Sequence, residues 1–267
     1  MDGSDVYTLH RGTRPLLMSV PHAGTALPDD QRQRYVERAF AFEDTDWHLE
    51  TLFDFVRSFG ASLIVPRYSR YLIDLNRPQE NVPMYPGVNN TELCPTRFFT
   101  GDPLYRSGYL PDNSEIERRV QAYWRPYHDA LRSELIRLRA AHGHVVLFDG
   151  HSIKSELPWL FEGRLPALNI GTADGAACDE AITERLSGLL ARQTTFSHVV
   201  NGRFKGGYIT RHYGRPRHGV HAVQLEMCQR CYMDETADPR GAYDEPGAAS
   251  VAPLIEQMLR EMLSWRP

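Results

Sequence analysis

Short apolar segments alternate along this chain with longer segments whose apolar residues recur at helical spacing. Short apolar runs bounded by Pro, Gly or polar residues are typical of buried strands, and a 3.6-residue recurrence is typical of amphipathic helices. Strands that alternate with helices predict an α/β fold, in which helices flank a sheet. We predict strands at residues 16–20, 62–65, 71–75, 145–148, 167–170, 198–200 and 220–225, and helices at 44–59, 114–141, 179–190 and 250–265.

Length and charge narrow the class of protein. The chain has 267 residues and a formal net charge of −4. Its sequence contains no segment typical of an interdomain linker, so we expect one domain over residues 1–267. Lys and Arg are dispersed, without the basic stripe of nucleic-acid binders. No apolar run approaches the roughly 20 residues that cross a bilayer, and the polar N-terminus lacks the apolar core of a signal peptide. We expect a cytoplasmic protein that binds neither nucleic acid nor membrane.

The four cysteines give little functional information. Only Cys228 and Cys231 are close together, as a C-x-x-C pair. A single pair is a weak indicator of structural zinc, because such sites use two. We interpret all four as reduced thiols, as is usual in the cytosol, and the role of the C-x-x-C pair stays open.

Four of the predicted strands lead directly into chemically reactive side chains. These side chains are His22, Asn76 with Arg77, His151 and Glu226. In open α/β sheets ligands bind beyond the carboxyl ends of the strands. Two imidazoles, a carboxylate and an amide–guanidinium pair at such ends predict an active-site rim. A long loop predicted at residues 78–111, rich in Pro, Gly and Asn, is also typical of functional segments.

His22 and His151 are candidate metal ligands. Two imidazoles on neighbouring strand ends can bind one ion through neutral nitrogens, and a catalytic zinc site needs three protein ligands and an open position. The alternative is that each imidazole only stabilises a turn by hydrogen bonding. Each His follows a turn-forming Pro or Gly, which favours the metal site.

The acidic residues of the segment EDTDWH are candidates for the third metal ligand. Asp44 is followed by Thr45, and the two are also typical of a helix N-cap, where an oxygen accepts from a free amide. Asp46 lies further along and could point back toward the metal. We predict Asp46 as the third ligand and keep Asp44 as the alternative.

Glu226 and the nearby arginines supply the remaining chemistry. A carboxylate beside a zinc site can accept a proton from the attacking water and pass it to a leaving amine, so we predict Glu226 as general base. The alternative for Glu226 is an ion pair with an Arg. Arg70 and Arg77 flank the predicted strand at 71–75, and their planar guanidinium groups match a carboxylate. Asp74 is expected to orient one of them.

Several local segments resemble one enzyme family, the N-formylglutamate amidohydrolases, and more distantly the zinc carboxypeptidases. These segments are SVPHAGTALP, EDTDWHLETLFDF, YSRYLIDLNRP, FDGHS, NGRFKGGYITRHYG and VQLEM, and they cover most of the chain from Ser19 to about Tyr232. The resemblance implies a mixed central sheet flanked by helices, as in zinc carboxypeptidases. It also implies hydrolysis of N-formyl-L-glutamate to L-glutamate and formate, a step of histidine breakdown, with one zinc ion per chain.

The resemblance assigns roles residue by residue. His22 and His151 match metal ligands, Glu226 matches the general base, and Arg70 matches the Arg that polarises the scissile carbonyl. The pair that grips a substrate carboxylate matches Asn76 and Arg77, and we expect further substrate contacts from Gly206, Gly207, Tyr208 and Arg211. One departure matters: zinc carboxypeptidases carry a Glu ligand where this chain has Thr25. The carboxylate ligand must therefore come from elsewhere, and Asp46 is our prediction.

Three other functions stay open at this point. The first is a related zinc amidase for another N-acyl amino acid or a peptide, which would need room beyond the formyl position. The second is a non-catalytic zinc- or ligand-binding protein, which would keep the histidines but would not need Glu226. The third is a metal-free structural domain, which an absence of bound zinc would support. A small anionic N-acyl amino acid is the expected partner in the enzymatic cases.

Overall fold

A mixed sheet forms the centre of the protein. The computed structural model describes residues 5–82, 89–237 and 241–267, and within them seven strands pair in the order β1-β3-β2-β4-β7-β5-β6. The strands are β1 (Tyr7–His10), β2 (Leu16–Ser19), β3 (Ser62–Pro66), β4 (Val145–Ile153), β5 (Leu168–Gly171), β6 (His198–Val200) and β7 (Val220–Cys228). The four central strands are parallel, whereas β1 is antiparallel to β3 and β5 is antiparallel to β7. The expected α/β fold with a mixed sheet is confirmed.

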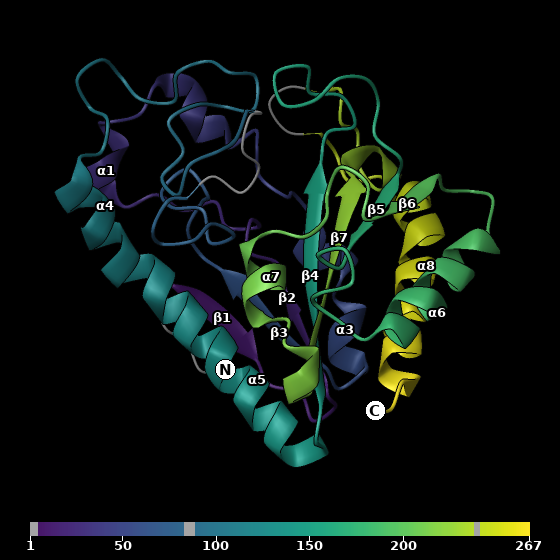
Figure 1. Cartoon of the computed structure of the whole chain (residues 1–267). Coiled ribbons are helices and arrows are strands. Elements are labelled where there is room, and N and C mark those ends of the chain that lie inside the picture. Colours follow the sequence, from purple (N-terminus) through teal and green to yellow (C-terminus); the bar gives the residue numbers. More distant parts are fainter. Residues whose placement is uncertain (1–4, 83–88, 238–240) are drawn as a thin grey trace.

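Helices cover both faces of this sheet (Figure 1). They are α1 (Asp29–Arg32), α2 (Leu49–Leu52), α3 (Phe55–Ser58), α4 (Asn113–Arg119), α5 (Arg125–His142), α6 (Glu180–Ala191), α7 (Tyr208–Tyr213) and α8 (Glu245–Ser264), with shorter turns at Glu37–Ala41, Pro216–His218 and Gln229–Cys231. A π-helical turn, Val120–Trp124, joins α4 to α5. In the described part of the chain, no helix combines the length and the apolar character that a membrane span requires.

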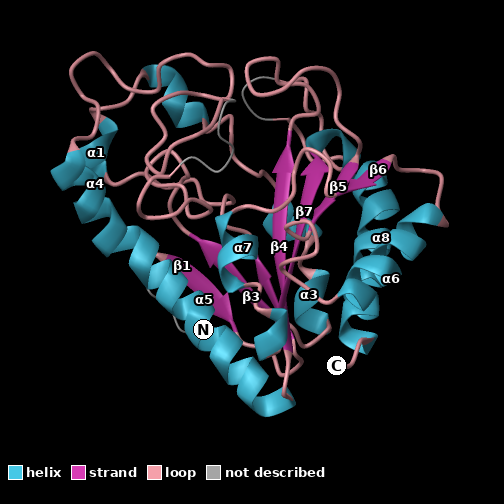
Figure 2. Ribbon diagram, viewed as in Figure 1, coloured by secondary structure: helices cyan, strands magenta, loops and turns pink. Residues whose placement is uncertain are grey.

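The alternating direction of side chains along each strand explains why the sheet has an apolar core on both faces. In β2, Leu16 and Met18 belong to the core that packs against α2, α3, α6 and α8. Leu17, between them, belongs to the core that packs against α5 and α7. Successive strand side chains point to opposite faces, so a strand that is apolar throughout is buried from both sides. Figure 2 shows that the loops gather beyond the ends of β4 and β7, at the edge where the parallel strands end.

The strand predicted at residues 71–75 is wrong. The segment is buried but consists of turns, in which Leu72 N–H donates to the Ser69 carbonyl and Arg77 N–H to the Asp74 carbonyl. The Asp74 carboxylate also accepts from the backbone N–H of Asn76, an Asx-type turn. A short apolar run indicates burial, and here the side chain of Asp74 turns the backbone away from a strand.

The helix predicted at residues 44–59 is broken. It begins only at Leu49, after His48 in the left-handed conformation (φ 61°), and it is interrupted between α2 and α3. The Asp44 carboxylate accepts from the backbone N–H of Phe99 at 3.0 Å and caps no helix. The residues before Leu49 are held by loop and site contacts, which override the helical pattern.

Other boundaries differ less. The remaining strand and helix predictions are confirmed, with β4 and β7 longer than expected and α8 beginning earlier, at Glu245. The edge strand β1 was missed, because YTLH is too short and polar to indicate a strand. The described parts of residues 78–111 form no helix or regular strand, as predicted, and residues 83–88 of that prediction lie outside the described residues.

Candidate active site

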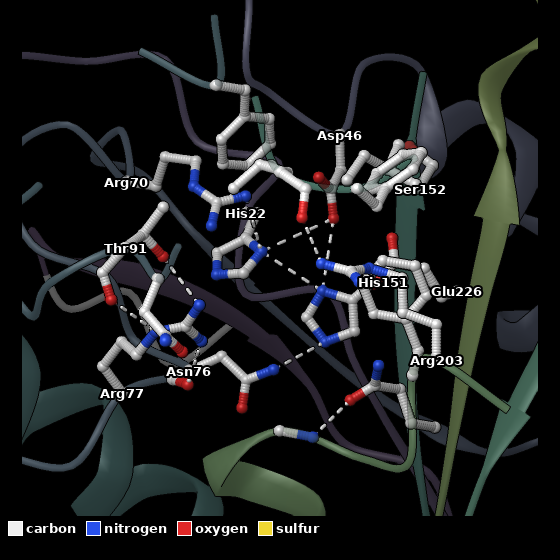
Figure 3. A pocket seen from close by; sticks show the side chains of 18 of the residues that line it. His22, Asp46, Arg70, Asn76, Arg77, Thr91, His151, Ser152, Arg203 and Glu226 are labelled. Carbon is white, nitrogen blue, oxygen red and sulfur yellow. Dashed lines mark hydrogen bonds and ion pairs between the residues drawn. The ribbon is translucent and has the colours of Figure 1, made fainter. Parts of the chain in front are cut away.

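A cavity of about 500 Å³ opens at the edge where β2, β4 and β7 end. Strands β2 and β4 are parallel, as are β4 and β7, so side chains at their carboxyl ends meet (Figure 3). His151 in β4 and Glu226 in β7 occupy the same rung of the sheet. The lining residues are His22, Asp46, Arg70, Asn76, Arg77, Asn89, Asn90, Thr91, Phe99, His151, Ser152, Ile153, Leu160, Phe161, Arg203, Phe204, Gly207, Gln224 and Glu226.

His22, Asp46 and His151 form a buried cluster with the spacing of a metal site. His151 Nδ1 lies 3.2 Å from His22 Nδ1 and 3.4 Å from Asp46 Oδ2, and His22 Nδ1 lies 3.7 Å from the same oxygen. Ligand atoms placed tetrahedrally at 2.0–2.1 Å from zinc are about 3.3 Å apart. The three donor atoms therefore fit one zinc ion.

The far nitrogens of both imidazoles contact carboxylates. His22 Nε2 donates to Asp74 Oδ1 at 2.7 Å, and His151 Nε2 lies 3.0 Å from Asp149 Oδ2. Carboxylate partners of this kind orient metal-binding histidines and leave the other nitrogen for the metal. Burial, and then the charge of Arg70, lower the pKa of His22, which favours the neutral form that binds metal.

The pKa of His151 is shifted in the opposite direction to that of His22. Burial lowers the pKa of His151, but the contacts with Asp149 and Asp46 and the charge of Glu226 together outweigh burial and hold that pKa well above its usual value. A metal ion needs the deprotonated nitrogen. Metal binding by this cluster is therefore expected to release a proton from His151.

Asp46 is the acidic residue that the fold brings to the histidines. Its backbone N–H donates to the His22 carbonyl at 3.1 Å, which places a residue far along the chain beside the first imidazole. Its side chain is 1% exposed, and Oδ2 has no hydrogen-bond partner among the described residues. A buried carboxylate oxygen is costly without a partner, and a metal ion would provide one. Asp44, the alternative ligand, instead contacts Phe99.

Arg70 lies directly beside this cluster (Figure 3). One of its terminal nitrogens, Nη1, is 3.2 Å from His22 Nδ1, and the other, Nη2, donates to Asp74 Oδ2 at 2.7 Å. Its guanidinium stacks over Phe99, 4.6 Å from the ring centroid. Asp74 thus orients both Arg70 and His22, which extends the prediction that it would orient an arginine.

Glu226 is buried in the cavity without a partner for its carboxylate in the described part of the chain. We predicted that Glu226 follows the end of a strand. The strand β7 instead continues to Cys228, so Glu226 lies within it. Burial raises the pKa of Glu226 to about 8, and the neighbouring charge of Asp46 adds to the rise, although His151 and Arg70 oppose it. A carboxyl group with a raised pKa in a cleft is typical of an acid–base catalyst. A bound cation would lower this pKa, because it favours the carboxylate.

Asn76 and Arg77 both line the cavity, but Arg77 is held by its own surroundings. The Arg77 guanidinium donates to the carbonyl and the hydroxyl of Thr91, at 2.9 and 2.6 Å, and to the Asn76 carbonyl. The substrate role predicted for this pair stays a prediction. The contacts fix the guanidinium at the cavity wall, where an anion could reach its remaining N–H groups.

The glycine-rich segment contributes less than expected. Gly207 lines the cavity, whereas Gly206, Tyr208 and Arg211 are not among the lining residues. Gly206 has a φ of 112°, which other residues rarely adopt. Arg211 donates to the Gly206 carbonyl, and Tyr208 stacks on His212. The close backbone approach that we predicted for the Gly pair is made to a side chain, Asn76.

Arg203 and Gln224 are among the polar residues of the cavity that were not predicted from the sequence. Arg203 lies over the ring of Phe161, 5.1 Å from its centroid, and contacts the Leu160 carbonyl. Both lie within segments that carry the family resemblance, NGRFKGGYITRHYG and VQLEM, but neither was singled out as a site residue. Gln224 could have been found, because it is two residues before Glu226 and so shares its face of the strand.

Comparison with known proteins gives close relatives in sequence. The family model described as N-formylglutamate amidohydrolase matches residues 14–233. The chain is 48% identical over 260 residues to the N-formylglutamate deformylase of Pseudomonas putida, covering 97% of this chain and 96% of that protein. It is 47% identical over 261 residues to the N-formylglutamate deformylase of Pseudomonas aeruginosa, covering 98% and 97%.

Solved structures share the fold. The crystal structure of N-formylglutamate amidohydrolase from Ralstonia eutropha JMP134 matches with a TM-score of 0.80 and 23% identity, covering 97% of both chains. A gene product of Agrobacterium tumefaciens matches with a TM-score of 0.71 and 19% identity, covering 97% of this chain and 95% of that chain. The likeness to zinc carboxypeptidases stays a prediction.

Proposed function

This chain belongs to the N-formylglutamate amidohydrolase family, and on that premise we propose that it hydrolyses N-formyl-L-glutamate to L-glutamate and formate. The observation that carries the proposal is the buried cluster of His22, Asp46 and His151 beside an unpartnered Glu226. A metal site next to a carboxylate of raised pKa supports amide hydrolysis by an activated water.

We assign a single zinc ion to the cluster, held by His22, Asp46 and His151. Zinc bound there would act as a Lewis acid on the formyl carbonyl and would make a water molecule acidic. The spacing of the three donor atoms and the orphaned Asp46 Oδ2 support this assignment. Asp74 and Asp149 hold the two imidazoles in the required orientation.

The protein's own residues then move the proton. Glu226 accepts a proton from the water as the water oxygen bonds to the formyl carbon. The carbon–nitrogen bond breaks, and Glu226 returns the proton to the leaving nitrogen, so that formate and the free amine of L-glutamate result. Arg70 donates to the oxygen on which negative charge develops, an electrostatic contribution that is usually large.

The substrate is a dianion, and the cavity is suited to it. Three guanidinium groups line the walls, from Arg70, Arg77 and Arg203. Arginine binds carboxylates through a planar fork. We therefore assign the amino-acid part of the substrate to the side of the cavity that carries Asn76 and Arg77.

A second candidate follows from the apolar wall of the same cavity. Leu160, Phe161 and Phe204 line it together with Phe99 and Ile153. Such a wall could accept an acyl group larger than formyl, so another N-acyl amino acid is the competing substrate. Location in the cytoplasm is a further part of the proposal, supported by four cysteines that are all buried and unpaired.

The test is a substrate panel with metal analysis on the same sample. Purified protein would be incubated with N-formyl, N-acetyl and N-propionyl forms of L-glutamate, and with N-formyl-L-leucine as a control that lacks the second carboxylate. We expect the highest kcat/KM for N-formyl-L-glutamate. A preference for the longer acyl groups would replace this substrate with the second candidate, and no release of any amine would contradict enzymatic function.

A further inference from the structure

Gln224 in β7 presents a fixed hydrogen-bond donor to the cavity. The residue is 3% exposed, and its Oε1 accepts from the backbone N–H of Gly207 at 2.6 Å. An amide oxygen can only accept and an amide nitrogen can only donate. The hydrogen bond from Gly207 N–H therefore fixes the orientation of the Gln224 amide. Its oxygen faces Gly207, and its Nε2 donor points away from Gly207.

The Nε2 group has no hydrogen-bond partner among the residues that the structure describes. Gln224 lines the cavity, so this donor faces space that a ligand could fill. A donor that faces a cavity can be satisfied by water or by an acceptor on a ligand that enters the cavity. Gln224 Nε2 is therefore available to an acceptor on a bound ligand.

Asn76 repeats the arrangement from the neighbouring wall. Its Oδ1 accepts from the backbone N–H of Ile209 at 2.8 Å, and its Nδ2 lies 3.0 Å from His151 Nε2. The segment at the start of α7 thus holds two side-chain amides by their oxygens. It also packs tightly against them, because a Cβ on Gly207 would lie 2.3 Å from Asn76 Nδ2. The Asn76 NH₂ group is engaged with His151 and Asp149, whereas the Gln224 NH₂ group is left for the cavity.

This part of the cavity lies away from the metal-binding nitrogens. Asn76 is on the Nε2 side of His151, whereas Nδ1 faces Asp46. Gln224 is in register with Asp149 in β4, two rungs before the rung of His151 and Glu226. The partner of the Gln224 amide is therefore expected to be a group remote from the reacting carbonyl. Arg77 adjoins Asn76 in the chain and also lines the cavity, so an anionic acceptor is the group that suits this part of the site.

We propose that Gln224 Nε2 donates to a carboxylate oxygen of the substrate and so contributes to substrate specificity. The inference rests on the proposed function, because it takes the ligand to be an N-acyl amino acid. The carboxylate is either the α- or the γ-carboxylate of the glutamate part. Gln224 acts with Asn76 and Arg77, and it binds substrate without moving protons.

The test is Gln224→Glu, which keeps the shape and the acceptor for Gly207 N–H but replaces the donor by a negatively charged acceptor. We expect KM for N-formyl-L-glutamate to rise by about 30-fold or more, since a buried donor becomes a like charge facing the carboxylate. We expect kcat to change by less than about threefold, because the group is remote from the reacting atoms.

Two modified substrates identify the carboxylate. The α-monoamide and the γ-monoamide of N-formyl-L-glutamate each replace one carboxylate by an amide, whose NH₂ can donate to the new carboxylate. For one of the two monoamides, KM should be nearly the same with Gln224→Glu as with the unmodified protein. An unchanged KM with all substrates, or an equal loss in kcat with all three, would overturn the assignment.

Gln193→Glu is the matched control. Gln193 Oε1 also accepts from a backbone N–H, that of Phe196, and its Nε2 donates to backbone carbonyls at the end of α6, away from the cavity. This substitution should lower the melting temperature slightly and leave KM unchanged. If Gln224→Glu does not fold, Gln224→Met removes the donor without adding charge, and it should still raise KM; an unchanged KM there would also overturn the assignment.

The assay separates this inference from the proposed function. Failure of the proposed function would show as no formate release by the unmodified protein. In that case calorimetric titration with L-glutamate still tests Gln224. Binding by the unmodified protein that is lost in Gln224→Glu supports the assignment, and equal binding, or no binding by either, contradicts it.

Discussion

The turns between Ser69 and Arg77 contribute to two buried polar clusters that differ in how fully their groups are paired. In the first cluster, around Arg119, each guanidinium nitrogen donates to a partner: Glu115, the Leu72 carbonyl with Tyr105, and Gln31. In the second cluster, at the cavity, Asp46 Oδ2 has no hydrogen-bond partner among the described residues and is only near two histidine nitrogens, at 3.4 and 3.7 Å. Within the same described residues no side chain hydrogen-bonds to the Glu226 carboxylate or to Gln224 Nε2, and both residues line the cavity. Both clusters are buried and charged, so burial alone does not distinguish them.

The difference shows which buried charges serve the fold and which await a ligand. Arg119 is fully buried, and its contacts join α4 to the turn at Leu72 and to Gln31 in α1. Paired groups of this kind lose stability when one member is removed. Groups left without partners reduce stability, and they are retained where a ligand completes them. The comparison predicts that substitutions in the first cluster change stability and that substitutions in the second change activity.

The largest effect on activity is expected at Glu226. Glu226→Gln keeps the shape but cannot accept a proton, so kcat should fall by about 10²–10⁴. Zinc content should be unchanged, and the melting temperature should be equal or higher, because a buried unpaired carboxyl group is removed. Formate release, metal analysis and thermal unfolding would be measured on one sample. Loss of zinc would instead make Glu226 a ligand, and near-normal kcat would exclude it from the chemistry.

Arg119→Met should have the largest effect on stability. Removing one member of a buried charged cluster costs roughly 3–5 kcal/mol, and Glu115 would keep only its contact with Arg118. Denaturant unfolding measures the loss, and kcat/KM of the folded fraction should stay close to that of the unmodified protein. A variant of unchanged stability but lowered kcat/KM would remove the distinction between the two clusters.

Asp46 and Asp44 form a matched pair within one segment. Asp46→Ala removes a ligand and should weaken zinc binding by about 100-fold or more, since even groups that only orient ligands contribute 10–100-fold. Asp44→Ala loses the contact with Phe99 N–H and should leave zinc affinity within about threefold. Competition with a chelating dye measures both affinities. The reverse order would make Asp44 the ligand.

The smallest of these effects is expected at Arg77. Arg77→Lys keeps the charge but loses the fork that Thr91 holds. We expect kcat/KM to fall by at least about tenfold, or roughly 1.4 kcal/mol. Steady-state kinetics with N-formyl-L-glutamate provide the value. Unchanged kinetics would leave Arg77 with a role in holding the loop at Thr91 alone.

The sequence allowed prediction of the layered fold and of the residues that meet at the cavity. Apolar runs gave most strands, and their ends pointed to His22, His151 and Glu226, because parallel strands bring their ends together. The turns at residues 71–75 could not be predicted in this way, because an apolar run indicates burial but not the backbone path. There the carboxylate of Asp74 accepts from backbone and side chains and sets the turn.

Residues of the cavity that lie far from strand ends were also not predictable. Arg203 is on a loop, and its place depends on its contacts with Leu160 and Phe161. Asp46 was predicted from its place in the acidic segment EDTDWH and from the missing carboxylate at Thr25. Its actual position depends on one backbone hydrogen bond to His22, which no sequence pattern encodes.

The central claim is that a cation bound by His22, Asp46 and His151 is required for deformylation. Purified protein would be treated with a chelator, dialysed, and titrated with zinc while formate release from N-formyl-L-glutamate is measured. We expect activity to be lost with the metal and to return in full at about one equivalent of zinc per chain. Undiminished activity in protein shown to be free of metal would contradict it.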